Sequence, residues 1–270
     1  MRWITARRRH PAAGYAIVAL MLVAIAVGYA ALTGAGSSAS ASAPSAGQQQ
    51  IAKGQEIFAR NCATCHGLEA QGTAVAPSLI GVGAAAVDFQ VSTGRMPAKE
   101  PGPENPRKPP ELSTAETLDV AGYVASLAGG PAIPSAEAVN PAAGSVAVGQ
   151  QLFIANCAQC HNFVGAGGAL TYGKYAPALT QATPTQIYEA MLTGPEAMPV
   201  FNDTTLTPEN KRDIIAYVVQ TRSEPNPGGF SLGRVGPVTE GLVAFLGLLL
   251  FMVLAALWIT AKQGKPEEHE

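Results

Sequence analysis

The four cysteines of this chain fall in two Cys-x-x-Cys pairs, and a histidine follows each pair directly. These motif residues are Cys62, Cys65 and His66, then Cys157, Cys160 and His161. Two thiols three positions apart on a helical turn reach the two vinyl groups of one haem and form thioethers, and the adjacent histidine is directed at the iron. The motifs therefore predict two covalently bound haem c groups, held by the cysteines and ligated by the histidines.

Other uses of four cysteines fit the count but not the pattern. The thiols could form disulfides outside the cytoplasm, a thioredoxin-like redox pair or one tetrahedral zinc site. None of these explains the histidine after each pair, or why all cysteines lie in the motifs. The two remaining histidines, His10 and His269, lie in the tails.

Methionine is the residue we expect opposite each histidine. Met96 and Met198 lie at matching places, each followed by proline, in irregular segments, whereas Met191 lies in an apolar pattern typical of a core. We therefore predict Met96 and Met198 as the second axial ligands. His/Met ligation fills both axial positions and raises the reduction potential, which favours electron transfer over an oxygenase or peroxidase.

Each ligating histidine needs a partner for its other ring nitrogen. A hydrogen bond there fixes the tautomer and the orientation of the ring. We expect the backbone carbonyls of Pro77 and Pro177 to accept it.

The sequence around the motifs is repeated. Residues 54–66 match residues 149–161 at an offset of 95, which also separates Cys62 from Cys157. Three further landmarks recur in the same order: Ala-Pro-x-Leu at 76–79 and 176–179, Thr-Gly and Met-Pro within 93–97 and 193–199, and an apolar segment at 112–124 and 206–218. The chain therefore contains a duplicated domain.

Each copy has the pattern of a small helical domain. Gly54, Ile57 and Phe58 share one face of a helix ahead of the first motif. Ser113 precedes Glu116 at the spacing of a capping box, and Thr207 with Pro208 predicts the start of the last helix of the second copy. Neither copy shows convincing alternating strands. Because blocks of under about 80 residues have marginal cores, a bound haem would supply the missing apolar core.

Two uninterrupted apolar runs, 14–32 and 241–259, are each long enough to span a bilayer. Arg2 and Arg7–Arg9 precede the first run, and Lys262 and Lys265 follow the second, so the positive-inside bias places both termini in the cytoplasm. A cleaved signal peptide is the alternative for the first run, which is longer than a usual signal core. Charged residues make up only 13% of the chain, and the net charge of −2 offers nothing for nucleic acid.

The predicted organisation is all-α, with two tandem domains between two transmembrane helices. The predicted segments are a cytoplasmic N-terminus (1–13), a transmembrane helix (14–33), a flexible linker (34–50), domain 1 (51–127), a linker (128–147), domain 2 (148–222), a linker (223–237), a transmembrane helix (238–260) and a cytoplasmic tail (261–270).

With the motifs placed, both copies resemble class I c-type cytochromes. The whole layout resembles the dihaem cytochrome cc subunit of the actinobacterial cytochrome bcc complex, the menaquinol–cytochrome c reductase. The resemblance implies a plasma-membrane subunit beside cytochrome b that passes electrons from a Rieske iron–sulfur protein to the copper centre of a terminal oxidase. It carries over all eight haem-binding positions named above, Met96 and Met198 included. The residues leave open an alternative function, as the dihaem subunit of another membrane redox enzyme such as a dehydrogenase or an oxidase. The motifs do not explain the loop 97–110.

Overall fold

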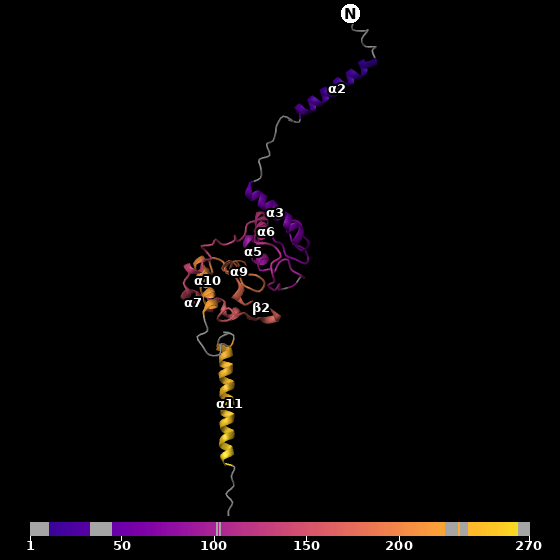
Figure 1. Ribbon diagram of the computed structural model, residues 1–270. Coiled ribbons are helices and arrows are strands. Elements are labelled where there is room, and N and C mark those ends of the chain that lie inside the picture. The colour runs from indigo at the N-terminus through magenta and orange to yellow at the C-terminus, as the bar shows by residue number, and fades with distance from the viewer. Residues whose placement is uncertain are drawn as a thin grey trace, which may run out of the picture. The chain divides into compact units, whose positions relative to one another are not determined.

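The computed structural model describes residues 11–32, 45–100, 102, 104–224, 232 and 237–263. The chain divides into two units, residues 1–45 and 46–270. The first contains helix α2 (Pro11–Leu32). The second contains two small helical domains and a long helix, α11 (Pro237–Gln263) (Figure 1). The mainly helical architecture confirms the predicted all-α fold.

The two domains repeat the same order of four helices. The first domain consists of α3 (Ala46–Asn61), α4 (Ala63–His66), α5 (Gly83–Ser92) and α6 (Thr114–Leu127). The second consists of α7 (Val146–Asn156), α8 (Ala158–His161), α9 (Pro184–Thr193) and α10 (Pro208–Ser223), with short 3₁₀ turns η1 (Pro141–Ala143), η2 (Thr171–Gly173) and η3 (Leu179–Gln181). Two-residue strands β1 (Gly168–Ala169) and β2 (Tyr175–Ala176) pair antiparallel, with Gly168 opposite Ala176.

The helix starts follow the capping residues. The Ser113 hydroxyl accepts from the Glu116 N–H while the Glu116 carboxylate accepts from the Ser113 N–H, which confirms the predicted capping box of α6. Thr207 caps α10 with Pro208 in its first turn, also as predicted. A second capping box, Thr183 with Gln186, starts α9.

In each domain the first and last helices cross at a glycine. A Cβ atom on Gly54 would lie 2.0 Å from the Asp119 carbonyl oxygen of α6. Beside this contact the Phe58 and Tyr123 rings pack with centroids 5.3 Å apart. The close approach of α3 and α6 therefore requires a residue without a side chain.

The second domain repeats this crossing between α7 and α10. A Cβ atom on Gly149 would lie 1.9 Å from the Asp213 carbonyl oxygen. The Phe153 and Tyr217 rings again pack with centroids 5.3 Å apart. The duplication predicted from the sequence is thus a duplication of this helix pair.

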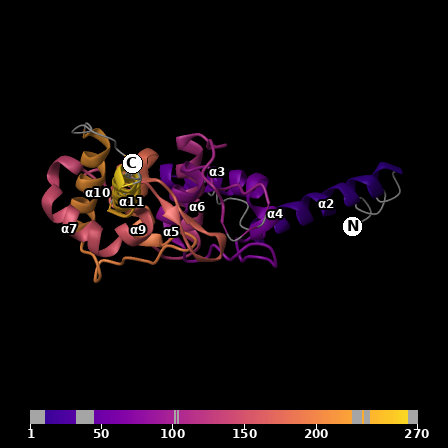
Figure 2. The same cartoon turned by 90° about the horizontal axis from the view of Figure 1, so that it is seen from below.

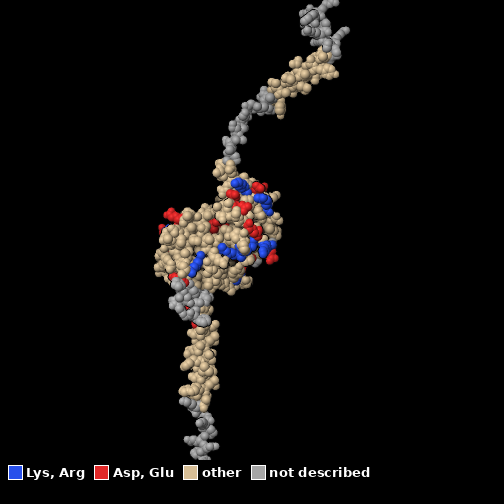
Figure 3. All heavy atoms as spheres, in the orientation of Figure 1, with Lys and Arg blue, Asp and Glu red and all other residues tan. Residues whose placement is uncertain are grey.

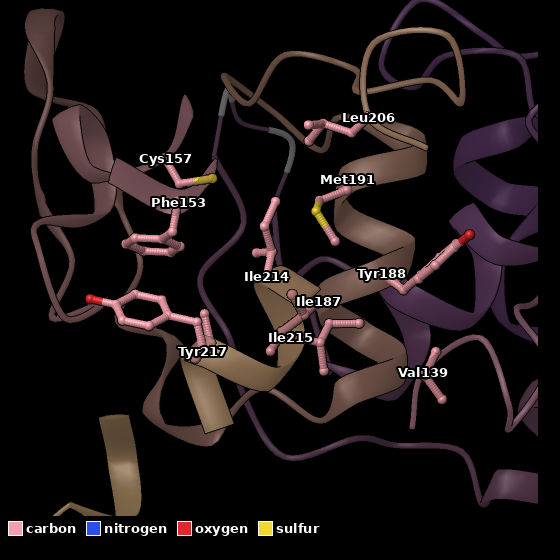
Figure 4. Close-up of a cluster of buried hydrophobic side chains, with 11 residues drawn as sticks. Val139, Phe153, Cys157, Ile187, Tyr188, Met191, Leu206, Ile214, Ile215 and Tyr217 are labelled. Carbon is pink, nitrogen blue, oxygen red and sulfur yellow. The ribbon is translucent and has the colours of Figure 1, made fainter. Parts of the chain in front are cut away.

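Each domain has its own apolar core. Gly54, Ile57 and Phe58 form the buried face of α3, as predicted. The core of the second domain brings residues of α7, α9 and α10 together, and Cys157 lies next to Phe153 at one side of it (Figure 4). Met191 is only 2% exposed in this core, which confirms its prediction as a packing residue.

The segments predicted as linkers carry more structure than expected. Residues 46–50 are the first part of α3, while residues 34–44 lie outside the described residues. Residues 128–147 pack on both domains: Pro131 accepts a hydrogen bond from the Ala85 N–H at 3.1 Å, and Val139 is buried in the second core. This segment packs on the domains because its Pro/Gly-rich stretch contains apolar residues, such as Val139, that become buried.

The domains themselves are in contact through α5 and α9, which lie side by side (Figures 1 and 2). The residues that join them surround the site described below.

Two helices are long and apolar enough to cross a membrane, over Ala12–Tyr29 in α2 and Val238–Ala261 in α11. None of either span is buried within the protein, and their surfaces show almost no charge (Figure 3). The arginines before α2, Lys265, and residues 225–231 of the last predicted linker lie outside the described residues.

We expect Gly54→Ala to destabilise the first domain by about 1–3 kcal/mol or more, because the new methyl group overlaps the Asp119 carbonyl. The measurement is urea unfolding of the full chain in detergent, followed by circular dichroism. Gly47→Ala in the same helix is the control, since a Cβ there meets nothing within 4 Å and alanine favours a helix. Equal stability of the two variants would contradict the role given to the crossing.

Candidate haem sites

The two Cys-x-x-Cys-His motifs adopt the same tight turn. The His66 N–H donates to the Cys62 carbonyl at 2.9 Å, and the His161 N–H donates to the Cys157 carbonyl at 2.9 Å. Each turn begins where α3 or α7 ends, so the helix crossing determines where the motif lies. Cysteines three residues apart on such a turn are on neighbouring positions of one face.

Each motif histidine is held through its Nδ1 atom. The His66 Nδ1 lies 2.8 Å from the Pro77 carbonyl oxygen, and the His161 Nδ1 lies 3.0 Å from that of Pro177. Both predicted acceptors are therefore confirmed. A carbonyl accepts only from a protonated nitrogen, so Nε2 is left with the lone pair that binds a metal. Burial lowers the pKa of His161, which favours the neutral ring.

Two glycines that the sequence analysis did not select allow these carbonyls to approach. Gly72 (φ +86°) and Gly167 (φ +81°) have left-handed backbones, and a Cβ atom on either would meet the Pro77 or Pro177 segment at 2.9 Å or less. Each also donates its N–H to the carbonyl of the motif histidine. The signal that could have found them is the offset of 95 residues between them.

The first cysteine of each motif has the environment of an unreactive thiol. Burial raises the pKa of Cys62 to about 11 and that of Cys157 to about 12, with a smaller contribution from the second cysteine of each pair. Redox-active cysteines show the opposite shift. All four thiols are free, and the described residues contain no cluster of three or more His, Cys, Asp or Glu suited to a metal ion. These findings disfavour the redox-pair and zinc alternatives.

The predicted methionines lie in segments that start with a glycine turn. Gly94 (φ +70°) and Gly194 (φ +58°) lie two and four residues ahead of Met96 and Met198. The Met96 N–H donates to the Gln90 carbonyl, and Met96 packs with Cys62 against the first core. Met198 packs against the second core.

A cleft in the second domain brings its predicted site residues together. Its wall includes both motif cysteines, His161, Met198 and apolar residues such as Leu179 and Phe201. A largely apolar hollow with two thiols, a carbonyl-held imidazole and a thioether on its wall fits a covalently attached haem. In the first domain, Met96 and Cys62 pack against the core, and His66 is buried.

The first domain also contributes to the wall of this cleft, which we call the second cleft because it contains the second motif. The sequence did not reveal this contribution. The contributing residues are Phe89, Thr93, Arg95, Glu104 and Arg107. Phe89 and Thr93 belong to the α5 end, and Arg95 directly precedes Met96. The cleft is thus built from both domains.

Gln186 is a central contact between the domains. Its Nε2 atom donates to the Ser92 hydroxyl at 3.1 Å, and its Oε1 atom accepts from Arg107 at 3.2 Å. The loop 97–110 adds two backbone contacts: Asn105 N–H donates to Glu196 at 2.7 Å, and Tyr175 N–H donates to Glu104 at 3.2 Å. The loop that the motifs left unexplained therefore docks the first domain on the second.

The chain has two helical domains, and each contains a Cys-x-x-Cys-His turn whose histidine is hydrogen-bonded to a proline carbonyl. This arrangement defines a tandem c-type cytochrome. The family model for cytochrome c matches residues 51–128, and that for cytochrome C oxidase, cbb3-type, subunit III matches residues 144–218. The chain thus carries two cytochrome c domains with two haem c groups, and its role is electron transfer.

Curated relatives identify the particular family. The cytochrome bc1 complex cytochrome c subunit of Corynebacterium efficiens is 44% identical over 254 residues, 86% of each chain. That of Corynebacterium diphtheriae is 43% identical over 89% of this chain and 92% of its own, and that of Mycobacterium leprae is 46% identical over 77% and 74%. This chain belongs to the family of cytochrome c subunits of the cytochrome bc1 complex.

A buried carboxyl group lies close to the contact of α5 and α9. Glu189 is 0% exposed, and burial together with the charge of Asp88 on α5 raises its pKa to about 10. An unfolded glutamate titrates near 4.3. Folding therefore takes up a proton between these values, and stability falls as the pH rises through that window.

We expect Glu189→Gln to flatten this pH dependence, because the amide mimics the protonated acid. The variant should gain stability over the parent with rising pH, by up to about 1.4 kcal/mol per pH unit within the window. Urea unfolding at a series of pH values measures this. Glu209→Gln, at an exposed position of α10, is the control and should follow the parent. A parallel shift in both variants would show that Glu189 is not the group responsible.

Proposed function

We propose that this chain is the electron-carrying subunit of a quinol–cytochrome c reductase. In this proposal it receives electrons from a Rieske iron–sulfur protein and passes them to the copper centre of a terminal oxidase. The observation that carries the proposal is the repeated site, in which the motif histidine is held by a proline carbonyl and the first motif cysteine and a methionine belong to the same core cluster. The relatives are named as subunits of the bc1 complex, which supports cytochrome b and Rieske subunits as partners.

In the proposed sites, cysteines attach the two haems and histidine and methionine bind the iron. The attachment residues are Cys62, Cys65, Cys157 and Cys160, and the axial ligands are His66, Met96, His161 and Met198. The bound haem c iron supplies reversible one-electron exchange at a potential that the axial ligands raise. With these histidines and methionines bound, the iron would have no position left for substrate. Quinol chemistry and translocation then belong to the assembled complex.

The protein around each site keeps its ligands in place. The Pro77 and Pro177 carbonyls fix the tautomer and orientation of the two imidazoles. The apolar cores exclude water, and the docked loop 97–110 keeps the two domains together. These are the requirements for repeated electron transfer with little structural change.

We further propose that α2 and α11 both cross the plasma membrane, with the termini in the cytoplasm and domains 51–127 and 148–222 outside. The two apolar helices support this. A tethered domain meets its partner at high effective concentration, so it needs no strongly charged face for steering. The net charge of −2 agrees with this.

Replacing a proposed methionine ligand by leucine should lower the reduction potential of one haem only. Leucine matches methionine in size but cannot bind iron. We expect a decrease on the order of 0.1 V for Met96→Leu or Met198→Leu, within the ~0.8 V range that axial ligands span. Potentiometric titration of the full chain measures it.

Met191→Leu is the matched control, since Met191 also lines the second cleft but is buried in the core. It should keep the parent potentials. A loss of potential in Met191→Leu, with none in Met198→Leu, would reassign the ligand.

Purification in mild detergent from native membranes, through a C-terminal tag, tests the proposed complex. Reduced-minus-oxidised spectra are then recorded after adding quinol. We expect b-type haem to co-purify and quinol to reduce both haem types. If c-type haem alone appears, or the partner is a dehydrogenase, the cytochrome assignment stands and the reductase proposal is wrong.

A further inference from the structure

The two domains differ in length at two places, and these places meet. Met198 follows His161 by 37 residues, against 30 for the first pair; five of the seven extra residues lie in the β1–β2 region, between Gly167 and Pro177. In the first domain the longer segment lies after Met96, in the loop 97–110. Glu104 of that loop accepts a hydrogen bond from the Tyr175 N–H of β2. The two insertions therefore form one interface at the second cleft.

Arg95 lies at this interface as a buried cation. It is only 7% exposed and lines the second cleft, although it belongs to the first domain. Its guanidinium group lies 5.0 Å from the centre of the Phe89 ring. With the described residues it makes no hydrogen bond or ion pair.

The carboxylates of the same cleft accept backbone hydrogen bonds, and the charge of Glu196 attracts Arg95 without a hydrogen bond or an ion pair to it. Glu104 accepts from the Tyr175 N–H, and Glu196 accepts from the Asn105 N–H. Arg107, the other cation of the wall, donates to Gln186. Arg95 is thus the cation on this wall that lacks a hydrogen-bonding partner among the described residues.

A buried charge is costly unless an opposite charge accompanies it. A haem carries two propionates, and a guanidinium binds a carboxylate through two parallel hydrogen bonds. We propose that Arg95 of the first domain binds a propionate of the haem held by the second domain. This rests on the proposal that Cys157, Cys160 and His161 hold that haem.

The consequence is that one dipeptide serves both haem sites. Met96 packs into the first core, while Arg95 lines the second cleft. A cation beside a haem stabilises the reduced state, in which the iron carries less positive charge. Docking of the first domain therefore raises the reduction potential of the second haem.

The test compares Arg95→Gln with the parent in the full, haem-loaded chain. We expect about a tenfold lower equilibrium constant for reduction of the second haem, which is about 59 mV for one electron. A Met96→Leu background, in which the first haem has a low potential, separates the two haems. Redox-induced infrared difference spectra should also show a shifted propionate carboxylate band.

Two variants separate the charge from other effects. Arg95→Lys keeps the charge and should recover most of the potential. Arg60→Gln removes an exposed arginine of α3 and should leave both potentials unchanged. If Arg95→Gln does not fold, the carboxylate band of Arg95→Lys carries the test, because the loss of the two-bond geometry should shift it.

Unchanged potentials and carboxylate band in Arg95→Gln would overturn the inference, as would a shift confined to the first haem. If that variant still binds two haem c groups and is reduced by quinol, only the role of Arg95 fails. If the second domain binds no haem through its cysteines in the parent chain, the proposed site fails instead.

Discussion

The close crossing of the first and last helix in each domain is the contact on which the rest of the structure depends. It exists because Gly54 and Gly149 have no side chain where the Asp119 and Asp213 carbonyls pass. The Phe58–Tyr123 and Phe153–Tyr217 ring pairs hold the helices at that distance. Since each Cys-x-x-Cys-His turn follows the first helix directly, this contact also determines where the thiols and the imidazole lie.

Each proposed haem site also includes residues from segments that lie well beyond the motif turn. A proline carbonyl 11 or 16 residues later orients the histidine, and Gly72 or Gly167 lets it come close. Cys62 is partly buried and Cys157 is buried, which raises the pKa of both thiols and favours their protonated form. The site is thus organised by backbone groups and burial, with few charges, which suits an electron carrier.

The duplication did not produce two independent domains. The insertions of the two copies contact each other, and Gln186 both caps α9 and links it to Ser92 and Arg107. The second cleft consequently has a wall from the first domain, Arg95 included. The two redox sites thus lie on domains that contact each other directly.

The sequence by itself determined mainly the features that depend on short spacing. These are the haem motifs, the capping box of Ser113 and Glu116, the buried face of Gly54, Ile57 and Phe58, and the two apolar helices. It also predicted the proline carbonyls, because each motif histidine needs an acceptor for its second ring nitrogen. Residues 46–50 and 128–147 were predicted as linkers because their composition is polar or rich in Pro and Gly, yet tertiary contacts order them. Only the tertiary structure decided that loop 97–110 docks on the second domain and that Arg95 enters its cleft. The reason is physical: these contacts join residues far apart in the chain through irregular insertions, which carry neither a period nor a matching copy in the repeat.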